Sequence, residues 1–332
     1  MPRILTTVVG SYPVPSWLPQ ARSREALRDA TLAVLKIQEN AGIDVISDGE
    51  LSRFDVNHPE TNGMIDYFLG PMEGVDVHPT RNDIEDFRRS EVSRYRNEPA
   101  AIVRGPIKEG HLNLLRDWEL VRGLTRHRLK FTCTGPHMLA KVVTDKHYLD
   151  LPRLLMDIAE VLRKQLEPID APVLQIDEAN ISGHPEEGDW AAKAIQHVFS
   201  SVQGEKAVHV CFGNYAGQTV QQGAWAKLTK FLNALPVDHL VLECARRPAD
   251  EARAFQDIRP EIGLGIGVID IKDNRIEAPD EVAASIERAA RLVGGADRIR
   301  YVHPDCGFWM LRREIVDRKM EALVRGRDLF EG

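Results

Sequence analysis

The chain has 332 residues, enough for one large barrel or two modest domains. Its apolar share of 43%, charged share of 28% and formal net charge of −7, with no Lys/Arg-rich run, exclude a nucleic-acid-binding protein. No apolar stretch approaches the roughly 20 residues that cross a bilayer, the N-terminal residues do not resemble a signal peptide, and the four cysteines show no disulfide-scaffold pattern. We therefore expect a cytoplasmic protein with no membrane partner.

Taken in chain order, short apolar and β-branched runs alternate with amphipathic helical patterns. The predicted strands are Leu5–Val9, Asp44–Ser47, Lys130–Thr134, Val173–Ile176, Lys206–Val210, His239–Leu242, Ile262–Val268 and Ile299–Val302. The predicted helices that follow most of them are Arg24–Ala41, Leu151–Gln165, Asp189–Val202, Gly223–Ala234, Ala249–Gln256, Pro279–Val293 and Arg312–Val324. This alternation indicates a parallel sheet.

Eight such strands in a chain of this length predict the α/β class and a (β/α)8 TIM barrel, with residues 1–332 as one domain. A doubly wound sheet is the alternative, but no GxGxxG motif follows an early strand. The glycine-rich run Gly263–Gly267 lies inside a strand pattern and therefore indicates close backbone packing or a bulge.

The segment at about 57–128, between the second and third predicted strands, is too long for one helical crossover and predicts an insertion. It contains a short apolar run at Ala100–Val103. We expect a helical excursion with a hairpin that overlies the barrel mouth. Its charge run is expected to be a solvated face rather than a ligand cluster, and comprises Arg88, Arg89, Glu91, Arg94 and Arg96.

Polar or glycine clusters mark nearly every point where a predicted strand gives way to a loop. They are Gly10-Ser11, Asp48-Gly49-Glu50, Gly135-Pro136, Asp177-Glu178, His209-Val210-Cys211, Glu243, Asp270-Ile271-Lys272 and Asp305-Cys306-Gly307. Active sites of TIM barrels lie at the C-terminal ends of the strands. The clusters therefore predict one shared catalytic site.

One imidazole, two thiols and one carboxylate among these clusters fit a tetrahedral zinc site, namely His209, Cys211, Cys306 and Glu243. His209 and Cys211 point to the same face of a strand because side chains alternate with period two. Alternatives remain. Each residue alone is more often a packed core residue, and Cys244 competes with Glu243 for the fourth position. A closed structural zinc site is a further alternative, although no CxxC occurs.

Segments spread over the whole chain resemble the catalytic C-terminal barrel of cobalamin-independent methionine synthase and the short, single-barrel members of that family. They are TTVVGSY at Thr6–Tyr12, ISDGE at Ile46–Glu50, TGP at Thr134–Pro136, QIDE at Gln175–Glu178, HVCFGNY at His209–Tyr215, Leu242–Glu243 and HPDCGF at His303–Phe308. The HxC, E and final DCG together form a specific signature, whereas any one of them alone is weak.

The resemblance implies that the four candidate ligands hold Zn²⁺, which takes a thiol substrate as thiolate for attack on a methyl carbon. It also implies that Glu50 and Asp177 bind the ammonium of homocysteine and that the backbone at Gly10-Ser11 meets its carboxylate. Glu178 adds to a negative mouth that suits an ammonium group. Capping of the next helix is the structural alternative for these acids.

Two features depart from the family pattern. Full-length members carry a second, N-terminal barrel that helps to hold polyglutamylated folate, and this chain has no room for it. The family usually has a histidine after the aspartate of the seventh-strand motif, as an acid near the methyl donor, whereas the matching stretch here is Asp270-Ile271-Lys272. Lysine is a poorer proton donor than histidine at neutral pH. We expect Asp177, Asp270 and Lys272 to be catalytic, and a methylcorrinoid or another donor with a good leaving group to be used faster than methyltetrahydrofolate.

The first functional hypothesis is a zinc-dependent S-methyltransferase that makes methionine from homocysteine. Its donor would be a methylcorrinoid, methyltetrahydrofolate or another small methyl compound. One alternative is a zinc-dependent thiol alkyltransferase that opens epoxides with coenzyme M, whose sulfonate would prefer a cationic pocket. Another is a non-catalytic zinc- or corrinoid-binding module. The sequence leaves the donor and the oligomeric state, including a homo-oligomer, undefined.

Overall fold

The computed structural model describes residues 3–20, 23–55, 59, 63–89 and 96–332. Eight strands form one sheet in the order β1-β11-β10-β9-β8-β7-β5-β2. They are β1 (Leu5–Thr6), β2 (Val45–Ser47), β5 (Arg128–Thr134), β7 (Val173–Glu178), β8 (Glu205–Val210), β9 (His239–Leu242), β10 (Gly263–Ile269) and β11 (Ile299–Pro304). Neighbouring strands are parallel. Parallel bridges from Thr7 to Val45 and from Ser11 to Gly49 connect the chain after β1 to β2 and the residues after it, which closes the sheet. The predicted (β/α)8 barrel is confirmed.

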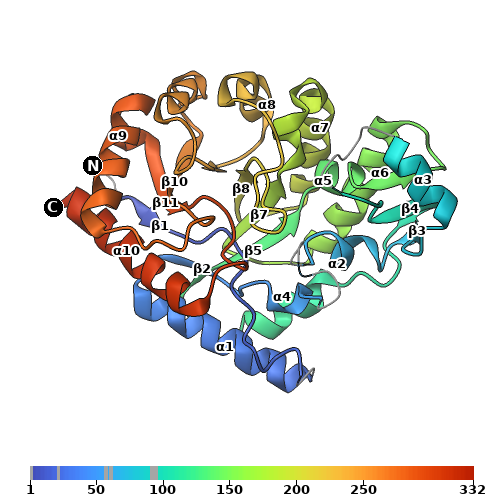
Figure 1. Cartoon of the computed structure of the whole chain (residues 1–332), viewed down its shortest axis with the longest axis horizontal. Helices are drawn as coiled ribbons and strands as arrows, with labels where there is room; N and C mark the ends of the chain where they lie inside the picture. The colour runs from blue at the N-terminus through green and yellow to red at the C-terminus, as the bar shows by residue number, and fades with distance from the viewer. Residues whose placement is uncertain (1–2, 21–22, 56–58, 60–62, 90–95) are drawn as a thin grey trace.

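Helices surround this barrel (Figure 1). Those that follow its strands are α1 (Arg24–Ala41), α5 (Pro136–Ala140), α6 (Leu151–Leu166), α7 (Gly188–Phe199), α8 (Thr229–Ala234), α9 (Pro279–Val293) and α10 (Arg313–Glu331). The hydroxyl of Ser23 caps the start of α1, and Gly42 ends it in the left-handed conformation. None of the helices within the described residues is long and apolar enough to cross a membrane.

Two predicted helices differ from the structure. The predicted α-helix Ala249–Gln256 is the 3₁₀ helix η5 (Ala249–Asp257). Its buried residues Ala252 and Phe255 are three positions apart, which is the 3₁₀ period. The predicted helix Gly223–Ala234 is a short 3₁₀ helix, η4 (Trp225–Lys227), followed by α8. Gly223 is not helical, and it passes so close to another loop that a Cβ there would lie 2.3 Å from the carbonyl oxygen of Ser182.

The chain between β2 and β5 forms the expected helical excursion. Its elements are η1 (Leu51–Arg53), α2 (Asp66–Leu69), β3 (Glu73–Asp76), α3 (Arg81–Arg89), β4 (Ala101–Lys108) and α4 (Leu114–Val121). Strand β3 pairs antiparallel with β4, but α3 joins them instead of a tight turn. Strand β4 also pairs with β6 (Val143–Asp145), which follows β5 in the chain.

The small sheet of β3, β4 and β6 lies at the flank of the barrel, against α6, and not over the mouth as the sequence suggested (Figure 1). Burial of Ala101–Val103 explains this position, because Ala101 and Val103 join the main hydrophobic core. Other parts of the excursion do reach the mouth, since Met64, Ile65 and Arg96 line its cavity.

The charge run of the excursion divides between solvent and the cavity. Arg88 and Arg89 are exposed, as expected for a solvated face, whereas Arg96 lines the cavity. Glu91 and Arg94 lie outside the described residues. The bounds of the insertion, about 57–128, stay a prediction.

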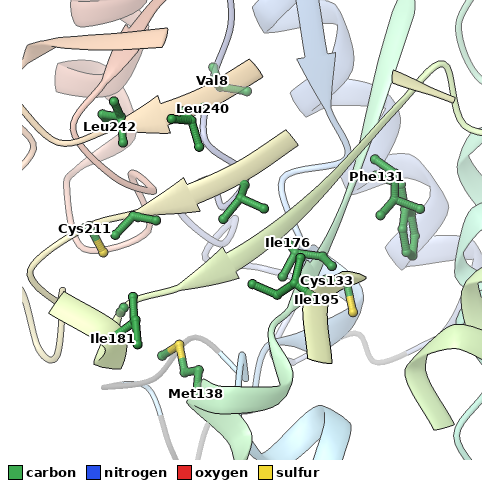
Figure 2. Packing of buried hydrophobic residues seen from close by; sticks show 14 of the residues in the cluster. Val8, Phe131, Cys133, Met138, Ile176, Ile181, Ile195, Cys211, Leu240 and Leu242 are labelled. Carbon is green, nitrogen blue, oxygen red and sulfur yellow. The ribbon is translucent and has the colours of Figure 1, made fainter. Parts of the chain in front are cut away.

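Apolar packing occurs on both sides of the barrel wall. The main core lies between strands and helices, where Ile176 of β7 packs near Ile195 of α7 (Figure 2). A smaller cluster fills the barrel interior and consists of Val9, Val45, Val173, Ala207, Val241 and Tyr301. Because side chains alternate along a strand, Gln175 and Asp177 point to the same inner face as Val173.

Strand β10 presents glycine at alternate positions. A Cβ at Gly265 would lie 2.5 Å from the carbonyl oxygen of Leu240 and 3.1 Å from Nε2 of His303, and a Cβ at Gly267 would lie 2.2 Å from Oδ1 of Asp305. The register between β10 and β11 also shifts twice along this stretch. The close packing and the irregularity expected from the glycine-rich run are therefore both present.

Candidate active site

A cavity opens at the C-terminal ends of the barrel strands. Its lining includes residues from predicted strand-end clusters, namely Ser11, Glu50, Asp177, Glu178, His209, Cys211, Cys306 and Gly307. Strands that are distant in sequence therefore converge on one site, as predicted from the barrel topology.

Three of the four predicted metal ligands form a compact group. The ligand atoms of His209, Cys211 and Cys306 lie within 4.8 Å of one another, and the two thiol sulfurs are 4.0 Å apart. Nδ1 of His209 donates a hydrogen bond to the carbonyl oxygen of Val241 at 2.9 Å. Nε2 is buried and has no hydrogen-bond partner within the described part of the chain. An imidazole held at one nitrogen, with the other free beside two thiols, suits a soft divalent metal such as zinc.

The protonation of this group favours a thiolate at Cys306. The hydrogen bond between the Cys306 and Cys211 thiols, reinforced by His209, holds the pKa of Cys306 well below its usual range despite burial. The same hydrogen bond, together with burial, raises the pKa of Cys211. Burial lowers the pKa of His209, but the negative Cys306 outweighs this effect and raises that pKa to about 9.

Glu243 lies beside the compact group but has other partners. Its Oε2 accepts a hydrogen bond from the backbone N–H of Phe212 at 2.9 Å, and its Oε1 lies 3.7 Å from Nζ of Lys272. Both side chains are almost completely buried. The carboxylate interacts electrostatically with Cys306 and His209 but is not among the ligand atoms that lie within 4.8 Å of one another, so Glu243 as the fourth ligand stays a prediction.

Cys244, the competitor for the fourth position, faces elsewhere. Its side chain lines a separate cavity between η5 and α9 and is not among the residues that line the mouth cavity. Its backbone N–H and that of Ala245 donate to Oδ1 of Asp305, and the N–H of Arg246 donates to Oδ2. Asp305 therefore holds the loop that carries Glu243, a role that the DCG motif did not reveal.

The predicted substrate acids lie in or at the cavity but differ in how they are held. Glu50 has a left-handed backbone with φ of 58°. Its Oε1 accepts from the Thr132 hydroxyl at 2.5 Å and lies 3.3 Å from the Arg53 guanidinium. A Cβ at Gly10 would lie 2.3 Å from this same oxygen, so a larger residue there would displace the Glu50 carboxylate.

Asp177 and Glu178 end β7 next to each other. Burial raises the pKa of Asp177 to about 7. Burial also raises the pKa of Glu178 to about 8, although its two oxygens accept the backbone N–H groups of His137 and Met138, each at 3.0 Å. Glu178 thus caps the start of α5, which is the structural alternative considered for it, although both acids line the cavity.

The seventh-strand motif lies apart from the cavity lining. The carboxylate of Asp270 accepts from the Lys272 N–H at 2.8 Å and pairs with Arg246 at 2.9 Å, and Asp270 lines the separate cavity of Cys244. The Lys272 ammonium donates to the Thr219 hydroxyl at 2.9 Å and faces Glu243. Lys272 therefore approaches the candidate metal centre through Glu243 and not through the cavity.

Several cavity residues were not predicted from the sequence. They are Met64, Ile65, Arg96, Met138, Asn180, Asn214, Tyr215, Val220 and Trp309, together with Val9, Ala179 and Gly213. Asn214 and Tyr215 belong to the HVCFGNY segment, and Trp309 directly follows HPDCGF, so the resembling segments carried a signal for these three. Met64, Ile65 and Arg96 come from the excursion, where no pattern marks them.

Fold and site together define a TIM barrel with a candidate metal centre in the cavity at the C-terminal mouth of its strands. The family model described as the catalytic domain of cobalamin-independent synthase matches residues 4–326. The chain therefore belongs to this family.

Individual relatives agree with this assignment. A methionine synthase of Thermococcus kodakarensis is 30% identical, with 99% of this chain and 94% of that protein covered. A methionine synthase of Pyrococcus abyssi is 28% identical, with 98% and 92% covered. The solved structure of a B12-independent methionine synthase from a Shewanella species superimposes with a TM-score of 0.83 at 24% identity and covers 99% of this chain and 98% of that one. The last comparison shows the shared fold.

Proposed function

We propose that the protein is a zinc-dependent methyltransferase that moves a methyl group to the thiol of homocysteine and forms methionine. The observation that supports this most is the unpaired, buried Nε2 of His209 beside two thiols 4.0 Å apart, in the cavity that Glu50 and Asp177 also line. The relatives named methionine synthase align along nearly the whole chain.

The donor set fits zinc. His209, Cys211 and Cys306 would hold the ion, with Glu243 as fourth and weakest ligand because Phe212 and Lys272 already engage its carboxylate. Bound zinc lowers the pKa of a coordinated thiol, so that a substrate thiol is a thiolate at neutral pH.

The acids at the mouth bind the other end of the substrate in this proposal. Asp177 and Glu50 place carboxylate oxygens in a cavity that is otherwise largely apolar, where a charge-assisted hydrogen bond to an ammonium is strong. The side chain of an α-amino acid thiol can then reach the sulfur group of Cys211 and Cys306 while its ammonium stays at these acids. The protein thereby orients the thiol toward the opening from which a methyl donor approaches.

The methyl donor is proposed to be a methylcorrinoid, or another compound with a good leaving group, in preference to methyltetrahydrofolate. Methylfolate needs a proton on its leaving nitrogen as the methyl departs, which calls for a general acid. Lys272 is engaged with Thr219 and Glu243. His303 is fully buried, and burial lowers its pKa to about 3, so it is neutral at physiological pH. Neither residue offers a suitable acid at the cavity.

An activity assay tests both parts of the proposal. Purified protein with zinc and homocysteine is incubated with methylcobalamin, with methyltetrahydrofolate or with simple methyl donors, and methionine is quantified. We expect the highest kcat/KM with methylcobalamin. A clear preference for the folate contradicts the argument from Lys272, and the absence of methionine with every donor contradicts the proposed reaction.

One observation favours the thiol alkyltransferase as a second candidate. Arg96 lines the cavity, and a guanidinium there suits the sulfonate of coenzyme M. Consumption of coenzyme M with an epoxide, without methionine formation from homocysteine, would establish this alternative. The two acids at the cavity argue against it, since they would repel a sulfonate.

A further inference from the structure

A buried lysine lies in the barrel interior beneath the cavity. Lys130 on β5 is only 2% exposed, and its ammonium donates to the carbonyl oxygen of Val8 and to Oε1 of Gln175, both at 2.7 Å. Nε2 of Gln175 donates to the carbonyl oxygen of Val9 at 2.8 Å and to Oδ1 of Asp177 at 2.7 Å. An unbroken chain of hydrogen bonds thus leads from Lys130 to a carboxylate in the cavity.

The chemistry of these groups permits one orientation of the Gln175 amide. An ammonium can only donate, so the amide oxygen must face Lys130. The carbonyl of Val9 can only accept, so the amide NH₂ must face Val9 and Asp177. Both amide hydrogens are then used. Within the described part of the chain, the Asp177 carboxylate accepts a hydrogen bond from the Gln175 amide, and this bond occupies Oδ1.

We propose that Lys130 is a positioning residue of the substrate site, which acts through the Gln175 amide to hold one oxygen of Asp177 and to leave the other for the ammonium of the substrate. This inference rests on the proposed function, because it assumes that Asp177 binds the substrate ammonium. It adds a residue that none of the strand-end clusters contains.

The position of Lys130 is costly for a merely structural group. A buried ammonium loses its hydration, and neutral carbonyl partners replace that hydration only in part. Burial lowers the pKa of Lys130 to about 7, while the negative charge of Asp177 acts in the opposite direction. A methionine would fill similar volume next to the apolar interior cluster without this penalty. The charge of Lys130 therefore stabilises the positions of Gln175 and Asp177 more than it stabilises the barrel.

The decisive measurement is homocysteine affinity in a double-mutant cycle. Zinc-loaded wild-type protein, Lys130→Met, Asp177→Asn and the double variant are titrated with homocysteine by calorimetry, and zinc content is measured for each. We expect about a tenfold weakening in Lys130→Met, as for the loss of one charge-assisted hydrogen bond. Zinc content should be unchanged. The double variant should bind no more weakly than Asp177→Asn alone, because Lys130 acts through Asp177.

A matched control separates positioning from stability. Arg327 is another fully buried cation, bound to the carbonyl of Ile4 and to Asp44 at the opposite end of the barrel. Arg327→Met should lower the thermal midpoint but leave homocysteine affinity unchanged. If Lys130→Met does not fold, Gln175→Glu serves instead, since it is isosteric, still accepts from Lys130 and loses both N–H donors. It should weaken binding to a similar extent and show the same lack of additivity.

The outcomes distinguish a failure of the proposed function from a failure of the role proposed for Lys130. Wild-type protein that does not bind homocysteine overturns the proposed function, and the inference falls with it. Wild-type binding that is weakened by Asp177→Asn but not by Lys130→Met or Gln175→Glu overturns the inference alone. Losses that add fully in the double variant also overturn it, because they would show that Lys130 acts independently of Asp177.

Discussion

The Lys272→Met variant is expected to bind zinc more tightly than the wild type when no thiol is present. In the structure, the ammonium of Lys272 lies 3.7 Å from Oε1 of Glu243, with side-chain exposures of 5% and 1%. This cation competes with a metal for the same carboxylate. Methionine retains the aliphatic length of lysine and removes the charge, so Glu243 becomes a stronger ligand.

The magnitude follows from the separation of the two charges. At about 4 Å, opposite unit charges attract by about 4 kcal/mol when the effective dielectric constant is about 20. If a third of this attraction is transferred to the metal, the gain is about 1.4 kcal/mol, which corresponds to about a tenfold change in affinity. Homocysteine should bind more weakly to Lys272→Met than to the wild type, because its thiol must displace a Glu243 carboxylate that binds the metal more strongly.

The assay is a competition between protein and a zinc chelator of known affinity, with and without homocysteine. Thr219→Val is the matched control, since it removes the other partner of the Lys272 ammonium without changing the charge. It should change zinc affinity by less than about threefold, a difference of about 0.6 kcal/mol. Equal or weaker zinc binding in Lys272→Met would refute the competition between lysine and metal.

Three further predictions concern the metal, the substrate and the stability of the fold. Metal analysis of Cys211→Ser and Cys306→Ser should show strong loss of zinc, whereas Cys244→Ser should keep it; the reverse pattern would move the metal site to the outer cavity. Asp177→Asn should weaken homocysteine binding by about ten- to a hundredfold, as expected for one charge-assisted hydrogen bond, with zinc retained; unchanged affinity would remove the ammonium site. Glu187 is half-buried, which raises its pKa, but hydrogen bonds from His137 and Lys141 outweigh this and lower the pKa from 4.5 to about 2. Its ionised form therefore stabilises the fold above about pH 4.5, and this contribution is lost as the pH falls towards 2. Chemical denaturation of Glu187→Gln should show a deficit on the order of 2 kcal/mol at pH 7 that shrinks over this range, and a deficit independent of pH would contradict the assignment.

The barrel could be predicted from the sequence because each strand is a short apolar run with a clear end. His209 and Cys211 were placed on one face by strand alternation, and the structure brings them together with Cys306. Such inferences use local periodicity and one topological rule, that parallel strands of a barrel end at the same mouth.

Features that depend on the partner of a side chain could not be predicted. Glu178 and Asp177 are neighbours in sequence and both line the cavity, yet only Glu178 caps α5, because its carboxylate accepts the N–H groups of His137 and Met138. Lys130 lies in a strand pattern and would ordinarily be expected at the surface. The excursion gave no indication that Arg96 would reach the cavity, because no periodic pattern in the sequence marks this residue.

The alternate glycines of β10 limit how this barrel can be redesigned. Because Gly265 and Gly267 lie against His303 and Asp305, β10 supplies backbone but no side chain to the barrel interior. Its neighbour β11 fills that space. A Cβ at Gly265 would also lie 2.5 Å from the carbonyl oxygen of Leu240, so a smaller residue at position 303 would not make room for a larger one at position 265. New chemistry at this mouth is more readily introduced on strands that already contribute side chains, such as β5 and β7, than on β10.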